Sequence, residues 1–214
     1  MKLKNYSLGK WIEGDGDGIP LINAVNDEII TYASSDGLDF NAMLNYARKF
    51  GGSALRKMTF QERGRMLKAL ALFLTEKKGA YYAVSYKTGA TKADSWIDID
   101  GGIGTLFAYA SLRRKLPNQS FCLDGDLAPL SKSNTFIGHH LLVPKEGVAI
   151  HINAFNFPIW GMLEKISVNL LAGMPAIVKP ATVSSYLTEV VVKDIIASGI
   201  LPEGSLQLIC GSAR

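Results

Sequence analysis

The stretch His151–Ala181, HINAFNFPIWGMLEKISVNLLAGMPAIVKPA, decides the fold of this chain. It begins inside a short apolar run, residues 147–153, whose length suits a strand that is buried on both faces. Pro158 then suits the first turn of a helix, and Gly173 suits a left-handed residue just after its end. A second apolar run, residues 176–179, follows at once. The spacing predicts a strand, a helix and a second strand.

Another helix and a third strand follow at the same interval. Ser184 or Ser185 can cap the beginning of this helix, and Gly199 can end it. Residues 205–210 then form a further apolar run of strand length. Strands and helices that alternate in this way form parallel sheets with right-handed crossovers. We therefore predict an α/β fold around a doubly wound parallel sheet, of which this chain supplies a part.

Polar loops follow the first two predicted strands. In sheets of this type, ligands bind beyond the carboxyl ends of the strands, which places residues 153–156 and 179–182 at one crevice. No G-x-G-x-x-G motif follows the first strand, so a pyrophosphate is not cradled there in the usual dinucleotide manner. After the second strand, Lys179 and Thr182 stand where a common dinucleotide fold places an acid, and no carboxylate occurs until Glu189. These residues favour a dinucleotide that carries a 2′-phosphate.

Several strings in the sequence resemble the aldehyde dehydrogenase superfamily. Residues 156–158 (NFP) and 179–181 (KPA) are similar to two of its motifs and have the expected order and spacing. Longer strings resemble the dehydrogenase portion of the bifunctional phenylacetic acid degradation proteins over almost the whole chain. These strings are HINAFNFP, WGMLEK, AGMPAIVKPAT, LPEG, LICGSA and TGATKADSWIDIDGGIGTLFAYAS.

This resemblance implies an oxidation in which a cysteine attacks an aldehyde, hydride passes to a nicotinamide, and the resulting thioester is hydrolysed. Asn156 matches the asparagine that binds the substrate oxyanion in the family. Such a donor contributes roughly a few kcal/mol to stabilisation of the developing negative charge. The alternative is that Asn156 only caps the helix that follows it.

The resemblance also implies a cofactor site. Lys179 matches the lysine that contacts the adenosine ribose, and Thr182 occupies the position at which many NAD-dependent members carry glutamate. A neutral side chain does not repel a 2′-phosphate, and Lys179 attracts it, so NADP is favoured over NAD. Without the resemblance, a lone lysine at a strand end is more commonly a solvated cation. The remaining cofactor contacts fall, largely through the backbone, on Ile152, Asn153, Ala154, Phe155 and Ala181.

Family members are much longer than 214 residues, and their glycine-rich loop, general-base glutamate, nucleophilic cysteine and catalytic domain are expected beyond Arg214. Neither Cys122, in a stretch expected to be irregular, nor Cys210, expected as a small buried thiol, matches the nucleophile. The resemblance implies the cofactor-binding, amino-terminal segment of an NADP-dependent dehydrogenase of a CoA-thioester semialdehyde in phenylacetate or related aromatic catabolism. We expect this segment to be inactive alone. The alternative is a stand-alone, truncated nucleotide-binding or assembly module without catalysis.

The chain is expected to divide into three parts: a helical scaffold over 1–130, a projecting hairpin over 131–146, and the first half of the Rossmann-like sheet over 147–214. In the family, the region of the hairpin joins the subunit interface, which implies a homo-oligomer. His139 and His140 are expected as a pair on a surface strand, and His151 as a core histidine with satisfied hydrogen bonds.

Local signals predict the elements of the scaffold. The run GDGDG over 14–18 is expected as the turn of a β-hairpin, because the later acidic ligands of a calcium loop are missing. A helix over Leu38–Phe50 is expected to end at the glycine pair 51–52. Thr59 opens a helix with a capping box, and residues 96–107 suggest another long helix. The helix over Leu38–Phe50 and the helix that begins at Thr59 are expected to pack on the sheet.

Composition excludes several other classes of function. The chain is 48% hydrophobic and 20% charged, which is ordinary for a globular protein, and no apolar run approaches the length of a membrane span. The net charge of +4 is small, and the basic clusters lack the interleaved aromatic residues of a nucleic-acid surface. Two cysteines and no leader-like beginning indicate the cytoplasm. No metal site is predicted.

Overall fold

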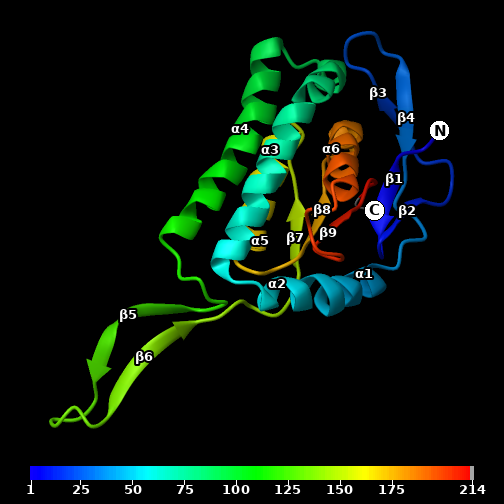
Figure 1. Cartoon of the computed structure of the whole chain (residues 1–214). Coiled ribbons are helices and arrows are strands. Elements are labelled where there is room, and N and C mark those ends of the chain that lie inside the picture. The colour runs from blue at the N-terminus through cyan, green and yellow to red at the C-terminus, as the bar shows by residue number, and fades with distance from the viewer. Residues whose placement is uncertain (213–214) are drawn as a thin grey trace.

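The alternating unit predicted from the second half of the chain forms one side of a five-stranded sheet (Figure 1). The computed structural model describes residues 1–212. Three parallel strands are joined by two helices, in the order β7 (Ala149–Ile152), α5 (Pro158–Leu171), β8 (Ala176–Lys179), α6 (Ser185–Ala197) and β9 (Leu206–Leu208). The predicted α/β class with a parallel sheet is therefore confirmed.

Most predicted ends of these helices are confirmed. Pro158 opens α5, and Gly173 and Gly199 adopt the left-handed conformation after α5 and α6, with φ values of +85° and +63°. Ser184 stands at the N-cap position of α6, directly after the short 3₁₀ helix η4 (Thr182–Ser184), but its hydroxyl makes no capping hydrogen bond.

The prediction that β7 is buried on both faces is wrong. Side chains of Ile150 and Ile152 are 58% and 75% exposed, whereas His151, which points the other way, is 6% exposed. The reason is that β7 is the last strand of the sheet, and α5 packs on only one of its faces. The opposite face of β7 carries an apolar surface that the described residues leave open.

Two strands near the amino terminus complete the sheet. These strands, β1 (Lys4–Ser7) and β2 (Lys10–Glu13), pair with each other, and β1 also pairs antiparallel with β9. The strand order is β2-β1-β9-β8-β7. The first 130 residues are thus not a purely helical scaffold.

The expected hairpin around GDGDG is also wrong. The strands on either side of this run belong to different sheets, because β2 pairs with β1, while β3 (Ile19–Ile22) pairs with β4 (Ile29–Ala33). The run 14–18 therefore connects two sheets. Local turn residues were sufficient to predict a turn there, but they could not indicate the partners of the flanking strands.

The helix predicted over residues 38–50 does not end at its glycine pair. The structure continues from α1 (Phe40–Tyr46) through a π-helical segment, η1 (Ala47–Gly52), into α2 (Ser53–Lys57). Gly51 lies so close to Gly204 that a Cβ atom would overlap the Gly204 carbonyl oxygen. The glycine pair therefore lies where the helix touches the loop before β9. Its missing side chains allow this close contact, and the pair does not end the helix.

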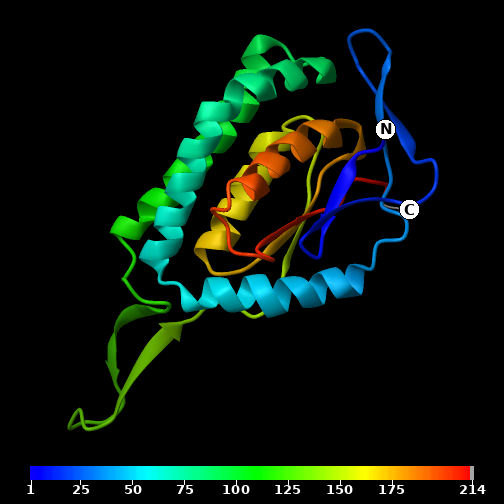
Figure 2. The ribbon, with the colours of Figure 1, turned by 45° about the vertical axis from the view of Figure 1, so that its right-hand side comes forward.

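Two long helices form an outer layer over the crossover helices, as Figures 1 and 2 show. These are α3 (Phe60–Ser85), which opens with the predicted Thr59 capping box, and α4 (Lys92–Ser111), each followed by a 3₁₀ turn, η2 (Tyr86–Thr88) and η3 (Leu112–Arg114). Helix α3 packs on α4 and α6, and α4 packs on α5. Helix α3 therefore covers the helices α5 and α6 and not the sheet itself, contrary to expectation. The other helix that was expected on the sheet does reach it, because the Gln207 amide of β9 donates to the Met43 carbonyl oxygen of α1 at 2.8 Å. Within residues 1–212, no helix combines the length and apolarity needed to span a membrane.

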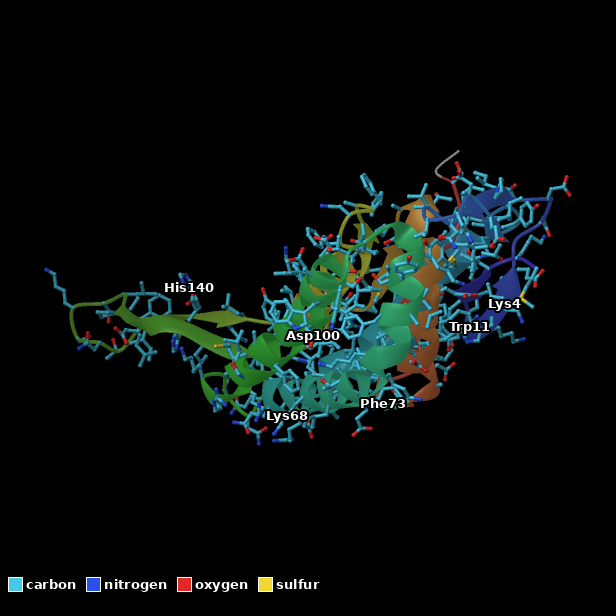
Figure 3. All side chains as sticks on the ribbon, turned by 90° about the horizontal axis from the view of Figure 1, so that it is seen from above. Lys4, Trp11, Lys68, Phe73, Asp100 and His140 are labelled. Carbon is cyan, nitrogen blue, oxygen red and sulfur yellow. The ribbon has the colours of Figure 1, made fainter. Side chains whose placement is uncertain are left out.

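A two-stranded hairpin projects from the body of the molecule (Figures 1 and 3). It consists of β5 (Cys122–Pro129) and β6 (Ile137–Leu142), so it begins before residue 131, and Cys122 lies in a strand and not in an irregular stretch. His139 and His140 are both exposed on β6, as expected for a surface strand. Most other residues of the two strands are exposed as well.

Candidate functional site

The two loops predicted to share a crevice do meet at one end of the sheet. In the register of the parallel strands, Ile152 of β7 lies opposite Lys179 of β8. One residue further, the backbone N–H of Asn153 donates to the carbonyl oxygen of Lys179 at 3.0 Å. The loop after β7 is thus joined to the end of β8 by a main-chain bond.

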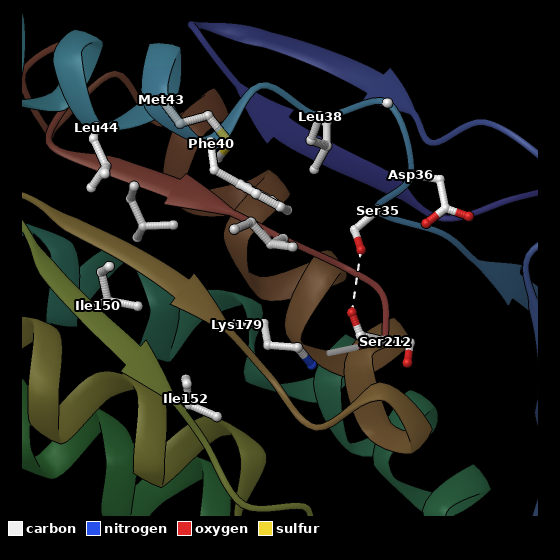
Figure 4. A pocket seen from close by; sticks show the side chains of 13 residues that line it. Ser35, Asp36, Leu38, Phe40, Met43, Leu44, Ile150, Ile152, Lys179 and Ser212 are labelled. Atoms are coloured by element: carbon white, nitrogen blue, oxygen red, sulfur yellow. Dashed lines mark hydrogen bonds between the residues drawn. The ribbon is translucent and has the colours of Figure 1, made fainter. Parts of the chain in front are cut away.

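Lys179 lines a pocket of about 500 Å³ on the open face of the sheet (Figure 4). Ile150 and Ile152 form one side of this pocket, and the segment between β4 and α1 contributes Ser35 and Asp36. The Lys179 ammonium group donates to the Pro180 carbonyl oxygen at 3.0 Å, and no ion pair within residues 1–212 involves it. Burial lowers the pKa of Lys179. The pocket therefore holds a partly desolvated cation without a carboxylate partner.

The surroundings of Thr182 agree with the absence of an acid on this loop. Its hydroxyl donates to the Gly211 carbonyl oxygen at 2.8 Å, and the neighbouring Ala181 is partly buried. The next carboxylate along the chain, Glu189, points elsewhere, because it accepts from the backbone N–H of Lys4 at 2.8 Å and pairs with Lys193 at 2.9 Å. It therefore does not replace the missing acid near Thr182.

Asp36 is a residue of this pocket that sequence reasoning missed. It comes from a loop far from residues 179–182 in the chain, and no local motif marked it. Figure 4 shows its carboxylate at the edge of the pocket, on a different segment from Lys179. The pocket thus contains one acid as well as the lysine.

Asn156 lies in a different pocket from Lys179. This second pocket, also of about 500 Å³, is lined by the turn residues Phe155, Asn156 and Phe157 and, across from them, by residues 88–90 and Asp94. Asn156 is exposed, as are Ala154 and Phe155, and its amide makes no hydrogen bond to any of residues 1–212. Asn156 and Lys179 therefore lie near the same end of the sheet, but their side chains line separate pockets.

The alternative that Asn156 caps α5 is not supported. The N-cap position is Phe157, which provides no side-chain bond. Instead, the Asp98 carboxylate of α4 accepts from the backbone N–H of Ile159 at 3.0 and 3.3 Å and from that of Trp160 at 2.7 Å. Asp98 is 4% exposed, and burial raises its pKa to about 6 despite these bonds. The cap therefore comes from another helix and leaves the Asn156 amide free.

Two polar side chains near the end of β7 are buried. Asn153 is 5% exposed, and neither its amide nitrogen nor its amide oxygen has a partner in the described residues. His151 receives a hydrogen bond from the Asn169 amide at 2.7 Å, but its Nδ1 has no partner there. Burial, together with the nearby charge of Lys165, lowers the pKa of His151. It is a core histidine, as expected, but only one of its two ring nitrogens has a hydrogen-bond partner.

Neither cysteine lies where a nucleophile would be needed. Cys210 is completely buried, and this burial raises the pKa of its thiol, as expected for a structural cysteine. Cys122 begins β5, and neither cysteine lines the pockets of Lys179 or Asn156. Within residues 1–212, no three His, Cys, Asp or Glu side chains are grouped as metal ligands.

The arrangement can therefore do two things chemically. An unpaired cation beside an open, apolar sheet face suits an anionic ligand with a flat or apolar body, and Lys179 has no competing carboxylate at Thr182. A dinucleotide fits this donor set. Separately, the free amide of Asn156 is a neutral donor that can stabilise negative charge on an oxygen atom.

Known proteins are similar to this chain in sequence and in fold. Residues 11–214 match the model of the Aldehyde dehydrogenase family. The chain is 43% identical to the 3,4-dehydroadipyl-CoA semialdehyde dehydrogenase of Aromatoleum evansii, over 100% of this chain and 42% of that protein. It is 28% identical to the D-glyceraldehyde dehydrogenase (NADP(+)) of Picrophilus torridus, over 98% of this chain and 41% of that protein.

A solved structure supports the fold independently. The betaine aldehyde dehydrogenase of Staphylococcus aureus, in complex with NAD+, superposes with a TM-score of 0.79 at 22% identity and covers 99% of this chain and 41% of that one. The chain thus spans about two-fifths of the length of the proteins that it matches. By the match over residues 11–214, the chain belongs to the aldehyde dehydrogenase family.

Proposed function

We propose that this chain is the amino-terminal, cofactor-binding part of a cytoplasmic aldehyde dehydrogenase that oxidises a CoA-thioester semialdehyde with NADP. The observation that carries the proposal is the free amide of Asn156, which stands on the turn after β7 while Asp98 caps the following helix. The substrate class rests on the 43% identity to a protein named as a CoA semialdehyde dehydrogenase. A role in phenylacetate or related aromatic catabolism belongs to the same proposal.

Asn156 would act on the substrate oxygen. When a cysteine outside residues 1–212 attacks the aldehyde, negative charge develops on that oxygen, and the Asn156 amide can donate to it. The bound nicotinamide would supply the hydride acceptor. Because the exposed amide has no partner within the described residues, it exchanges only hydrogen bonds to water, and no protein hydrogen bond breaks, when it donates.

The role of Asn156 is tested in the complete protein encoded by the reading frame that contains this chain. Replacement of Asn156 by Ala should lower kcat about 10²- to 10³-fold, as expected for loss of one oxyanion donor. Cofactor affinity should fall less than kcat, because Asn156 and Lys179 line different pockets. An unaltered kcat would contradict the proposed role. Wild-type protein without aldehyde oxidation, but with nucleotide binding, would instead favour the stand-alone module.

The preference for NADP is proposed from Lys179 and Thr182, with Ile152, Asn153, Ala154, Phe155 and Ala181 as further cofactor contacts. Titration of the protein with both dinucleotides should show tighter binding of NADP. Thr182→Glu should weaken NADP binding at least about tenfold, because a carboxylate near a phosphate is repulsive, and should affect NAD less.

Val183→Glu is a matched control for that variant. Neither residue lines the pocket of Lys179. The Thr182 hydroxyl donates to Gly211, next to the pocket residue Ser212, whereas Val183 is 63% exposed and lines the pocket of Asn156, so the same charge is added one residue away but on the other side. It should leave the ratio of the two affinities nearly unchanged. A clear preference of the wild-type protein for NAD would sink the NADP proposal and would direct attention to Asp36, the acid in the pocket.

We also propose that the projecting hairpin joins subunits of a homo-oligomer. Its strands carry large apolar side chains that are more than half exposed, namely Leu123, Leu127, Ile137, Leu141 and Leu142. Leu123 and Leu141 are paired across the two strands and form one exposed apolar surface, of the kind that marks protein–protein contacts. Sedimentation of the complete protein should give a dimer or larger assembly. The double variant Leu123→Lys, Leu141→Lys should form a smaller assembly. A wild-type monomer would contradict this assignment.

A further inference from the structure

The first turn of α5 is capped by a side chain from another helix. The capped residues directly follow the turn that carries Asn156. Helix α5 begins at Pro158, which has no N–H, so Ile159 and Trp160 provide the first N–H groups that need acceptors. Both of them donate to the Asp98 carboxylate of α4. The next N–H, of Gly161, already donates to the carbonyl oxygen of Phe157 at 2.9 Å.

No local group can replace Asp98. Ile159 is 1% exposed, so water does not readily reach its N–H, and Phe157 at the N-cap position has no polar side chain. A buried N–H without an acceptor costs about 1 to 3 kcal/mol. The carboxylate also faces the positive end of the helix dipole, which partly offsets the cost of its own burial. Within residues 1–212, Asp98 is therefore the only acceptor for the first two N–H groups of α5.

The backbone of α4 also comes unusually close at this point. Gly102 lies one helical turn after Asp98 and thus on the same face of α4. A Cβ atom on Gly102 would lie only 3.0 Å from the Cα of Trp160. The bond from Asp98 and the missing side chain of Gly102 therefore act at the same turn of α5, which leaves this turn little freedom to move relative to α4.

We propose that Asp98 is a positioning residue that fixes the turn before α5 and thereby orients the Asn156 side chain toward the substrate oxygen. Asn156 is separated from Ile159 by Phe157 and Pro158 only, and the proline ring fixes one of the intervening dihedral angles. A shift of the first turn of α5 is therefore transmitted directly to Asn156. This inference rests on the proposed function of Asn156.

The structural part of the inference is tested by amide hydrogen exchange in this chain. Asp98→Ala should accelerate exchange at Ile159 and Trp160 at least about tenfold, because both N–H groups lose their acceptor. Asp98→Asn should have a smaller effect, since both groups donate to Oδ1, and an amide oxygen can still accept them. Unchanged exchange at both amides in Asp98→Ala would overturn the inference.

Asp100→Asn is the matched control. Asp100 lies on the same helix, but its carboxylate bonds to Lys78 and Tyr82 of α3 and to no residue of α5 within residues 1–212. Its replacement should leave exchange at Ile159 and Trp160 unchanged. Equal acceleration in the Asp98 and Asp100 variants would show general loosening of α4, and it would also overturn the inference.

The functional part is tested by kinetics of the complete protein. Asp98→Ala should lower kcat for aldehyde oxidation about tenfold, because a small misplacement of a catalytic group has an effect of this order or larger. The KM for the nucleotide should stay within about twofold, and Asp98→Asn should recover part of kcat. A merely structural role predicts full kcat for the folded fraction, which would overturn the positioning role. If the wild-type protein oxidises no aldehyde, the proposed function fails, while the exchange experiment still decides whether Asp98 holds the turn.

Discussion

The two ends of α5 are closed by residues of opposite charge from different helices. At the beginning, Asp98 of α4 accepts from two backbone N–H groups. At the end, Arg63 of α3 donates through Nε to the carbonyl oxygen of Leu171 at 2.7 Å and through Nη1 to those of Leu55 and Met58 at 2.9 and 2.7 Å. Each charge therefore matches the adjacent end of the helix dipole.

The difference between the two ends lies in what they join. Arg63 ties α5 to the end of α2 and the loop before α3, a region without candidate site residues, so its contribution is to the stability of the fold. Asp98 acts at the turn that carries Asn156. One end of the same helix is thus mainly structural, and the other lies beside the candidate site.

Removal of Arg63 should have the largest effect on stability. Arg63→Met would keep much of the side-chain volume but leave three carbonyl oxygens without this donor, and we expect a loss of about 3 to 5 kcal/mol in the free energy of unfolding. Urea denaturation of the chain measures it. Arg65→Met, at an exposed position of the same helix, should change the free energy by less than about 0.5 kcal/mol. Similar losses in both variants would show that Arg63 contributes only a surface charge.

The effect of Asp98 on stability should depend on pH. Burial raises its pKa from 3.8 to about 6, so between these values the folded chain binds more protons than the unfolded chain. Stability from this group is therefore greatest below its unfolded pKa and falls as pH rises through the folded pKa. Relative to Asp98→Asn, which cannot ionise, the wild-type chain should lose on the order of 2 to 3 kcal/mol between about pH 4 and pH 7. A pH-independent difference would mean that Asp98 has an ordinary pKa.

Local sequence signals predicted α5 better than they predicted its surroundings. Pro158 and Gly173 marked its two ends because each residue has an intrinsic backbone preference. Asp98 and Arg63 carry no such signal, since their partners in or beside α5 are 61 and 108 residues away along the chain. The one available indication was negative: Phe157 cannot cap a helix, so an acceptor had to come from elsewhere.

The same distinction applies to the strands and to the site. The alternating pattern of strands and helices predicted that residues 153–156 and 179–182 meet at one end of the sheet, and the bond between Asn153 and Lys179 joins them there. Exposure of Ile150 did not, because a run of apolar residues has the same composition whether or not a second layer covers it. Asp36 in the pocket of Lys179 also depends on long-range packing. Periodicity therefore predicted local elements, whereas pairing and coverage required the tertiary structure.

Close contact at the beginning of α5 can be tested with two glycines of α4. Alanine at Gly102 would press on the backbone of Trp160, whereas a Cβ atom on Gly104 would have no atom within 4 Å. We expect Gly102→Ala to destabilise the chain by about 1 to 2 kcal/mol and Gly104→Ala to stabilise it by about 0.5 to 1 kcal/mol. Thermal unfolding of both variants shows whether each substitution raises or lowers the stability. Stabilisation by both would show that α4 can move away from α5, and would weaken the argument that this end is rigid.

The smallest effect on stability is expected at Asn156, although this residue lies beside the same end of α5. Its amide bonds to none of residues 1–212, and Asp98 already accepts the N–H groups that a capping side chain would serve. Asn156→Ala should therefore change the free energy of unfolding by less than about 0.5 kcal/mol, because loss of a true cap typically costs about 1 kcal/mol. Denaturation of this variant beside Asp98→Ala separates the two residues. A loss of a full capping contribution at Asn156 would restore the helix-capping interpretation, and it would remove the observation on which the proposed oxyanion role depends.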